Sequence, residues 1–224
     1  MNTILLKHNN VLDLLQALVD AHSSTSIDLI ICSSRTEFIA QIIAGLQKEP
    51  AVSQVEDDGH GGGSETESPI KPTHPVLKPT LNRLYTSQNV KLIFCPTVSA
   101  LRAYLSGYLV QLPRPDPTSQ RRTVIVNSLA LHHGSSEFTV QGLSQTMATM
   151  VAAGARARRQ VQLVECMDSQ DSNTADHGPQ LWNNEVPLLS SSLKIGEGGA
   201  RWGLRTIPVA RIASRWFEFK DVDL

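Results

Sequence analysis

Three cysteines and one asparagine stand where α/β enzymes often carry their reactive groups. Cys32, Cys95, Asn127 and Cys166 lie at or near the ends of four short apolar runs, which are followed by polar turns or helical patterns. A nucleophilic cysteine needs a base and an electropositive niche. A buried cysteine is otherwise a small apolar residue. We expect the second role for all three cysteines.

The elements that position these residues are predicted to be strands of a parallel sheet. Short apolar runs bounded by turns are typical of strands that are buried on both faces. The four predicted strands cover residues 27–32, 91–95, 122–128 and 161–166, and the run at 122–128 is predicted to be the central strand. Apolar residues at helical spacing predict helices over residues 11–21, 34–46, 76–86, 97–109 and 136–159.

The C-terminal part of the chain has a different pattern. Residues 185–195, 204–212 and 215–219 are predicted to be strands, and a glycine-rich connection joins the first two. A short connection between neighbouring strands favours an antiparallel arrangement at the edge of the sheet. The predicted fold class is therefore α/β, a three-layer core with a mainly parallel sheet and C-terminal antiparallel strands.

Composition limits the class of protein. The 224 residues are 41% hydrophobic with a net charge of −1, which predicts one domain over residues 1–224 and no overall basic field for nucleic acid. Residues 49–75 are rich in Gly, Ser, Glu and Asp and are predicted to be a disordered insertion. Three cysteines without close spacing argue against a disulfide framework or a zinc site. We also expect no signal peptide and no membrane span.

The turn after the first predicted strand lacks the residues that bind a nucleotide. A phosphate loop needs glycines whose backbone amides approach the phosphate, and a lysine that supplies charge. The turn here is Ser33, Ser34, Arg35 and Thr36. Arg35 at a helix start is able to meet a phosphate, but a surface turn capped by Ser34 and Glu37 is the favoured interpretation. Asn127 takes the place of a magnesium-binding aspartate and is a poorer ligand for that ion.

Other polar and aromatic groups are weaker candidates for a site. His132 and His133 have no second cluster of metal ligands near them in sequence, and a loop or partly buried pair is expected. The five arginines able to contact DNA phosphates are Arg121, Arg122, Arg156, Arg158 and Arg159, although a solvated face is the default for such charges. Trp202, in a glycine-rich turn, is a candidate anchor for a partner protein.

The order of these elements resembles the RecA-like core of eukaryotic recombinase paralogues. The resemblance is carried by residues 28–36 at the phosphate-loop position, 91–96 with the helix that follows, 123–128 at the metal-binding strand, and 161–166 before the closing strands. It extends over most of residues 25–219, without the insertion. The ATP motifs of the family are missing at residues 33–36 and at Asn127. The segment after Cys166, which matches a DNA-binding loop of active recombinases, contains Asp168 and two further aspartates but no Lys or Arg.

The resemblance implies a subunit that has lost ATPase activity and binds no cofactor. Such paralogues assemble with other RecA-like subunits, assist homologous recombination and DNA repair in the nucleus, and reach single-stranded DNA through the complex. A second family with inactive RecA-like folds is the accessory subcomplex of Elongator, a tRNA-modification factor, which implies a cytoplasmic location instead. A third alternative is an enzyme that uses the cysteine-lined edge of the sheet. The sequence leaves these alternatives open.

Overall fold

The computed structural model describes residues 2–6, 8, 10–20, 25–48, 75–78, 80–108, 121–170, 176–188 and 206–220. The predicted insertion, apart from Pro75, lies outside the described residues. Trp202 lies outside them as well.

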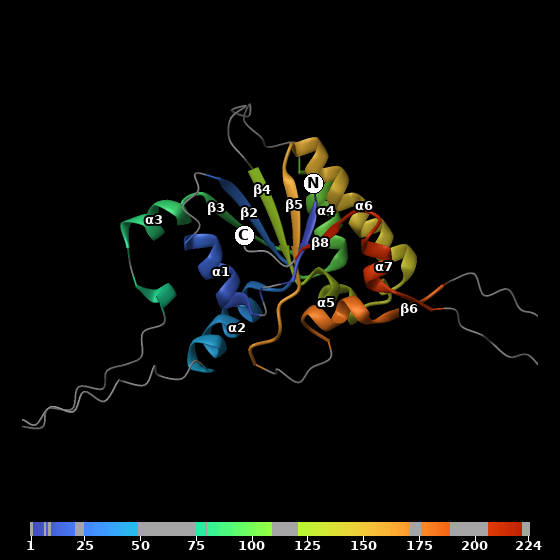
Figure 1. The fold of residues 1–224 in the computed structure, drawn as a ribbon, viewed down its shortest axis with the longest axis horizontal. Coiled ribbons are helices and arrows are strands. Elements are labelled where there is room, and N and C mark those ends of the chain that lie inside the picture. The colour runs from blue at the N-terminus through green and yellow to red at the C-terminus, as the bar shows by residue number, and fades with distance from the viewer. Residues whose placement is uncertain are drawn as a thin grey trace, which may run out of the picture.

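A six-stranded sheet forms the centre of the molecule (Figure 1). Its strands are β1 (Thr3–Leu5), β2 (Ser26–Ile31), β3 (Val90–Phe94), β4 (Arg121–Val126), β5 (Gln160–Val164) and β8 (Glu218–Lys220), in the order β3-β2-β4-β5-β1-β8. All five pairings between neighbours are parallel. The predicted strand at residues 122–128 is confirmed as a central strand, because β4 lies between β2 and β5.

Helices cover both faces of this sheet (Figure 1). One face carries α1 (Val11–Asp20) and α2 (Arg35–Lys48), and η1 (Pro75–Leu77) and α3 (Leu81–Ser87) lie against α1. The other face carries α4 (Val98–Ser106), α5 (Ser128–His133), α6 (Val140–Ala157), η2 (Pro179–Asn183) and α7 (Val209–Ala213). This three-layer α/β arrangement is the one expected of a RecA-like core.

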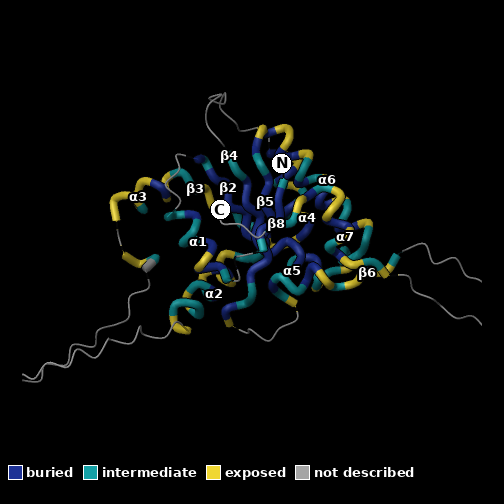
Figure 2. The backbone as a smooth tube through the Cα atoms, in the orientation of Figure 1, coloured by how far each residue is buried: buried dark blue, intermediate teal, exposed yellow. Residues whose placement is uncertain are grey.

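Alternation along the buried strands explains why they are continuous apolar runs in the sequence. In β2, Ile27, Leu29 and Ile31 pack on the α1 and α2 side, whereas Ile30 packs on the α4 and α6 side together with Cys32. Successive side chains of a strand point to opposite faces, so a strand covered on both sides is apolar at most positions. The buried Asp28 is the exception in β2. The dark centre of Figure 2 is this doubly covered sheet.

Antiparallel pairing is confirmed for two of the three predicted C-terminal strands, which differ from the prediction in extent and place. The third, predicted over residues 215–219, is β8, and it pairs parallel with β1 at the edge of the main sheet. β6 (Glu185–Pro187) and β7 (Thr206–Pro208) pair antiparallel, but they form a separate two-stranded sheet rather than an edge of the main one. The strand predicted over residues 204–212 was too long, because α7 begins at Val209 directly after Pro208. A proline fixes φ and suits the start of a helix.

Two elements were missed by the sequence analysis. β1 has only three residues, too few for a period-two pattern, and it sits between β5 and β8 inside the sheet. α5 is a six-residue helix that was not predicted, and in it His132 and His133 form a partly buried pair, one of the two arrangements expected for them. None of the helices in the described ranges is long and apolar enough to cross a membrane.

Candidate functional site

A cleft opens at the carboxyl edge of the sheet, between the ends of β2 and β4. The chain leaves β2 toward α2 on one face and leaves β4 toward α5 on the other, so α2 and α5 lie on either side of the strand ends (Figure 1). Ligands of open α/β sheets bind where neighbouring strands connect to opposite faces in this way. The cleft has a volume of about 560 Å³.

The turn from Ser33 to Thr36 forms one wall of this cleft, and its capping box is confirmed. The backbone amide of Ser34 donates to Glu37 Oε2 at 2.9 Å, and the amide of Glu37 donates to Ser34 Oγ at 3.2 Å. Ser33, Thr36 and Glu37 line the cleft, but Arg35 does not and is exposed. The one cation of the turn is thus not among the groups that line the cavity.

Asn127 forms part of the floor and its oxygen is already used. Its backbone is left-handed, with φ 60° and ψ 40°, a conformation that asparagine tolerates better than most residues. Asn127 Oδ1 accepts a hydrogen bond from the backbone amide of Cys166 at 2.7 Å, which ties the end of β4 to the end of β5. The atom that a metal would need is therefore engaged with the backbone.

The first strand–turn–helix unit of the sheet is β1 and α1, of which the sequence predicted the helix but not the strand. In nucleotide-binding α/β domains the first such turn carries the glycine-rich phosphate loop. Residues 6–10 between β1 and α1 contain no glycine. Asn10 caps the start of this helix, since its side-chain Oδ1 accepts from the amide of Asp13 at 2.8 Å.

Glu165 is a buried acid behind the cleft that the sequence analysis did not single out. Its carboxylate accepts from the backbone amide of Leu129 at 2.8 Å and from Ser128 Oγ at 3.2 Å, at the start of α5. Burial raises the pKa of Glu165 to about 7 although these hydrogen bonds favour the charged form. Removal from water is therefore the larger of the two effects.

The three cysteines lie at strand ends as predicted, and all are buried free thiols. Burial raises the pKa of Cys32, of Cys95 and of Cys166 above the usual thiol value. The negative charge of Glu165 adds to the rise at Cys32 and Cys166. These surroundings oppose formation of a thiolate, which is the form that attacks an electrophile.

The two neighbouring histidines of α5 have different environments. His132 is buried and its ring nitrogens lie 2.7 Å from Ser128 O and 2.9 Å from Thr146 Oγ1. Burial lowers the pKa of His132, so the neutral ring is favoured. His133 is partly exposed and lies 3.1 Å from Asp176 Oδ1. Within the described ranges no group of three or more His, Cys, Asp or Glu side chains could hold a metal ion.

The arginines singled out as DNA contacts gather at the opposite, amino edge of the sheet. Arg159 is buried there, 3.3 Å from Asp28 Oδ1, and its Nη1 donates to the carbonyl oxygen of Arg122 at 2.9 Å. The hydroxyl of Tyr108 donates to Asp28 Oδ2 and lies 2.9 Å from Thr123 Oγ1. Arg159 therefore holds the fold together and is not a surface charge.

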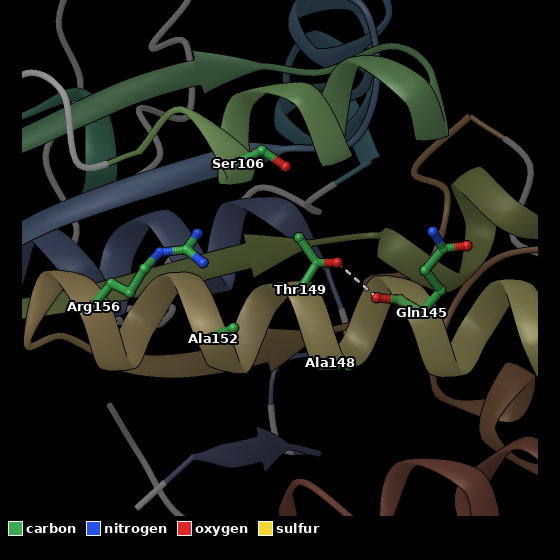
Figure 3. A pocket seen from close by; sticks show the side chains of 6 residues that line it. All are labelled: Ser106, Gln145, Ala148, Thr149, Ala152 and Arg156. Atoms are coloured by element: carbon green, nitrogen blue, oxygen red, sulfur yellow. Dashed lines mark hydrogen bonds between the residues drawn. The ribbon is translucent and has the colours of Figure 1, made fainter.

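The other four arginines are at least partly accessible. Arg121 and Arg122 are half-buried at the start of β4, and Arg156 and Arg158 are exposed at the end of α6. Arg156 borders a groove of about 420 Å³ along α6 beside Ser106, as Figure 3 shows, and donates to Leu105 O at 3.2 Å. The tertiary structure thus brings sequence-distant arginines to one edge, but it leaves fewer of them free than the sequence suggests.

An exposed apolar surface lies beside the edge strand β3. We define the β3-edge surface by Leu77 of η1, by Leu81, Leu84 and Tyr85 of α3, and by Leu92 of β3. Leu81 is 86% exposed, Leu84 57% and Tyr85 60%. Helix α3 lies at the periphery, away from the buried centre (Figure 2). Exposed apolar side chains in a limited region are candidates for a contact with another protein.

No protein-family model matches the chain, and no curated protein matches it. A functional proposal therefore depends on the residues and the geometry described above.

Proposed function

We propose that this chain is a non-catalytic, RecA-like subunit that works within a hetero-oligomer. The proposal is carried by a contrast within one fold. The cleft at the nucleotide-binding edge has no Lys or Arg among its described lining residues, and the oxygen of Asn127 is bonded to the backbone. Phosphate recognition needs positive charge and free amide donors. The β3-edge surface, in contrast, exposes large apolar side chains.

The β3-edge surface supports assembly because β3 is the last strand on its side of the sheet. The exposed Leu92 lies on this strand, and the exposed face of α3 comes just before it in the chain. An uncovered edge strand with apolar neighbours is a template for pairing with another chain. Exposed leucine and tyrosine side chains gain about 25 cal/mol per Å² of apolar area when a partner covers them.

The context that we propose first is homologous recombination and DNA repair, as a recombinase paralogue in the nucleus. Its partners are then other RecA-like subunits, and single-stranded DNA is reached through the complex. The accessible arginines at the amino edge, Arg121, Arg122, Arg156 and Arg158, are the residues that support a phosphate contact.

The second candidate is an accessory subunit of the Elongator tRNA-modification complex, with a cytoplasmic location. Two observations favour it over direct DNA binding. Arg159 is buried against Asp28, and the segment after β5 presents Asp168 to the cleft. Neither arrangement offers a cation to a DNA strand.

Affinity purification with mass spectrometry tests the assembly and separates the two contexts. The variants are Leu81→Asp combined with Tyr85→Asp on α3, and Ala148→Asp on the exposed side of α6 as a matched control. We expect the wild type and the control to retain RecA-like partners and the α3 variant to lose them. Recombinase paralogues among the partners, with nuclear foci after DNA damage, indicate the first context. Elongator subunits among the partners, and a loss of wobble-uridine modification in cells that lack this protein, indicate the second context.

Two results would contradict the proposal. One is a wild-type chain that purifies as a monomer without partners. The other is tight ATP binding, measured by equilibrium dialysis, that disappears in Arg35→Ala. The first result removes the assembly role, and the second shows that the turn at residues 33–36 binds phosphate.

A further inference from the structure

The cleft at the carboxyl edge is lined by polar groups that have no partner within the described part of the chain. Asn127 is 6% exposed, and with its Oδ1 bonded to Cys166 its Nδ2 finds no acceptor among the described residues. Gln41 is 9% exposed and also lines the cleft, and no hydrogen bond joins its carboxamide to the described residues. His177 Nδ1 is buried and unpaired in the same lining.

Buried polar groups are nearly always hydrogen-bonded in folded proteins. An unpaired buried group costs about 1–3 kcal/mol. His177 Nδ1 is a group of this kind, and the carboxamides of Asn127 and Gln41 face the same cleft without a protein partner among the described residues, so a ligand or ordered water is needed to complete them. The cleft volume of about 560 Å³ lies within the range of ligand pockets.

The charge of the cleft is negative, which decides the kind of ligand. Glu37 and Asp168 line it, each with one oxygen engaged with the local backbone, Glu37 with the amide of Ser34 and Asp168 with the amide of Gln170. The second oxygen of each carboxylate accepts no hydrogen bond from the described residues. No described lining residue is Lys or Arg. An anionic nucleotide would meet repulsion here, and a cation would meet attraction.

We infer that this cleft binds an arginine-containing peptide segment of a partner protein. The guanidinium group donates to Glu37 and Asp168, since arginine forms charge-assisted hydrogen bonds with carboxylates. A backbone carbonyl of the same peptide accepts from Asn127 Nδ2. The apolar part of the lining, Cys32, Pro96 and Leu131, suits the aliphatic part of the arginine side chain. A free metal ion fits less well, because the described residues include no metal-holding group of three or more His, Cys, Asp or Glu side chains.

This inference deepens the proposed function, since it names the chemistry of one partner segment. It concerns a different surface from the β3-edge surface, and its test uses no partner protein. Loss of partners in the α3 variant and loss of peptide binding in a cleft variant are therefore separate results.

Fluorescence anisotropy on the full-length chain tests the inference. The probe is a labelled hexapeptide with two arginines and four glycines, and the control probe has citrulline, a neutral isostere, in place of each arginine. We expect the arginine peptide to bind about tenfold more tightly than the citrulline peptide, a ratio that corresponds to about 1.4 kcal/mol of charge interaction.

Two substitutions in the cleft and one control outside it remove a negative charge while keeping local hydrogen bonds. Glu37→Gln preserves the capping box, because glutamine serves there as well as glutamate. Asp168→Asn keeps an acceptor for the amide of Gln170. We expect each of these two substitutions to weaken binding of the arginine peptide about three- to tenfold. Glu185→Gln, at an exposed carboxylate of β6 outside the cleft lining, is the control and leaves binding unchanged.

Several outcomes would overturn the inference. They are no binding of the arginine peptide by the wild type, equal binding of both peptides, displacement of the peptide by ATP at equal concentration, or an equal loss in Glu185→Gln. Circular dichroism checks that each variant is folded. If Asp168→Asn does not fold, Glu37→Gln alone decides the outcome.

Discussion

The two edges of the same sheet differ in how their polar groups are paired. At the amino edge, Asp28, Arg159, Tyr108 and Thr123 come from four different segments and bond to one another, although Arg159 Nε has no partner among the described residues. At the carboxyl edge, Asn127 Nδ2, the carboxamide of Gln41 and His177 Nδ1 face a cleft without a partner among the described residues. A satisfied network contributes to stability and specifies the fold, whereas unpaired groups keep binding capacity for another molecule.

This difference teaches that the position of charged residues in the sequence is a poor guide to their role. The arginine cluster of the sequence contains one residue that is central to the core. The cleft, which has no arginine among its described lining residues, holds polar groups without a protein partner. Four substitutions test the contrast, and they are ordered here from the largest expected effect to the smallest.

Arg159→Met should destabilise the chain by about 3–5 kcal/mol, because it leaves the carboxylate of Asp28 buried without its cation. Chemical denaturation followed by circular dichroism measures the free energy of unfolding. Arg158→Asn is the matched control at the neighbouring arginine, since Arg158 is exposed and its backbone, with φ 53°, suits asparagine. The control should change stability by no more than about 0.5 kcal/mol. Equal effects at both positions would mean that Arg159 is not a core residue.

Glu165→Gln should remove a pH dependence of stability. The pKa of Glu165 is raised in the folded chain from 4.5 to about 7, so the folded state holds a proton that the unfolded state has released between these values. Its stabilising contribution is complete below pH 4.5 and is lost as the pH rises through 7, a change of about 3 kcal/mol. The difference in unfolding free energy between wild type and variant, measured from pH 4.5 to 8, should show this slope. A constant difference across that range would contradict the raised pKa.

Tyr108→Phe should cost about 2 kcal/mol, since the buried carboxylate of Asp28 loses the donor hydroxyl while the ring packing remains. Thermal or urea unfolding measures this loss. Tyr104→Phe on α4 is a control of the same chemistry, because Tyr104 contacts the ring of Tyr108 but no hydrogen bond from its hydroxyl is found among the described residues. A Tyr108→Phe chain as stable as the control would break the amino-edge side of the comparison.

Gln41→Met should leave stability within about 0.5 kcal/mol of the wild type, or raise it slightly. The carboxamide of Gln41 is unpaired in the described chain, so its removal breaks no hydrogen bond there. Urea unfolding without peptide is the measurement. A loss of 2 kcal/mol or more would place Gln41 among the satisfied groups and remove the contrast between the two edges.

Much of the fold could be read from the chain, because burial on both faces of a parallel sheet imposes an apolar run on each strand. The strands at residues 27–32, 91–95, 122–128 and 161–166 correspond to β2, β3, β4 and β5 within one or two residues at each end. The capping box of Ser34 and Glu37 was predictable for a similar reason, since both partners lie three residues apart.

Shorter and less regular elements escaped prediction. Thr3–Leu5 is too short to show a period, and its place inside the sheet depends on pairing with β5 and β8 far along the chain. The strand expected over residues 204–212 gave way to α7 after Pro208, since an apolar run of this length fits either a strand or a buried helix.

By itself the sequence determined the α/β class, the central strands and the lack of a glycine-rich phosphate loop, since these depend on residue type and on neighbours a few positions apart. Tertiary structure alone decided which polar groups far apart in the sequence are paired. Asp28 and Arg159 are 131 residues apart and meet because β2, β4 and β5 lie side by side. Asn127 follows β4, and Gln41 lies on α2, which follows β2. The two residues line one cleft because β2 and β4 end at the same edge of the sheet and α2 and α5 lie on opposite faces. Contacts of this kind depend on the order of strands in the sheet, which local sequence patterns do not specify.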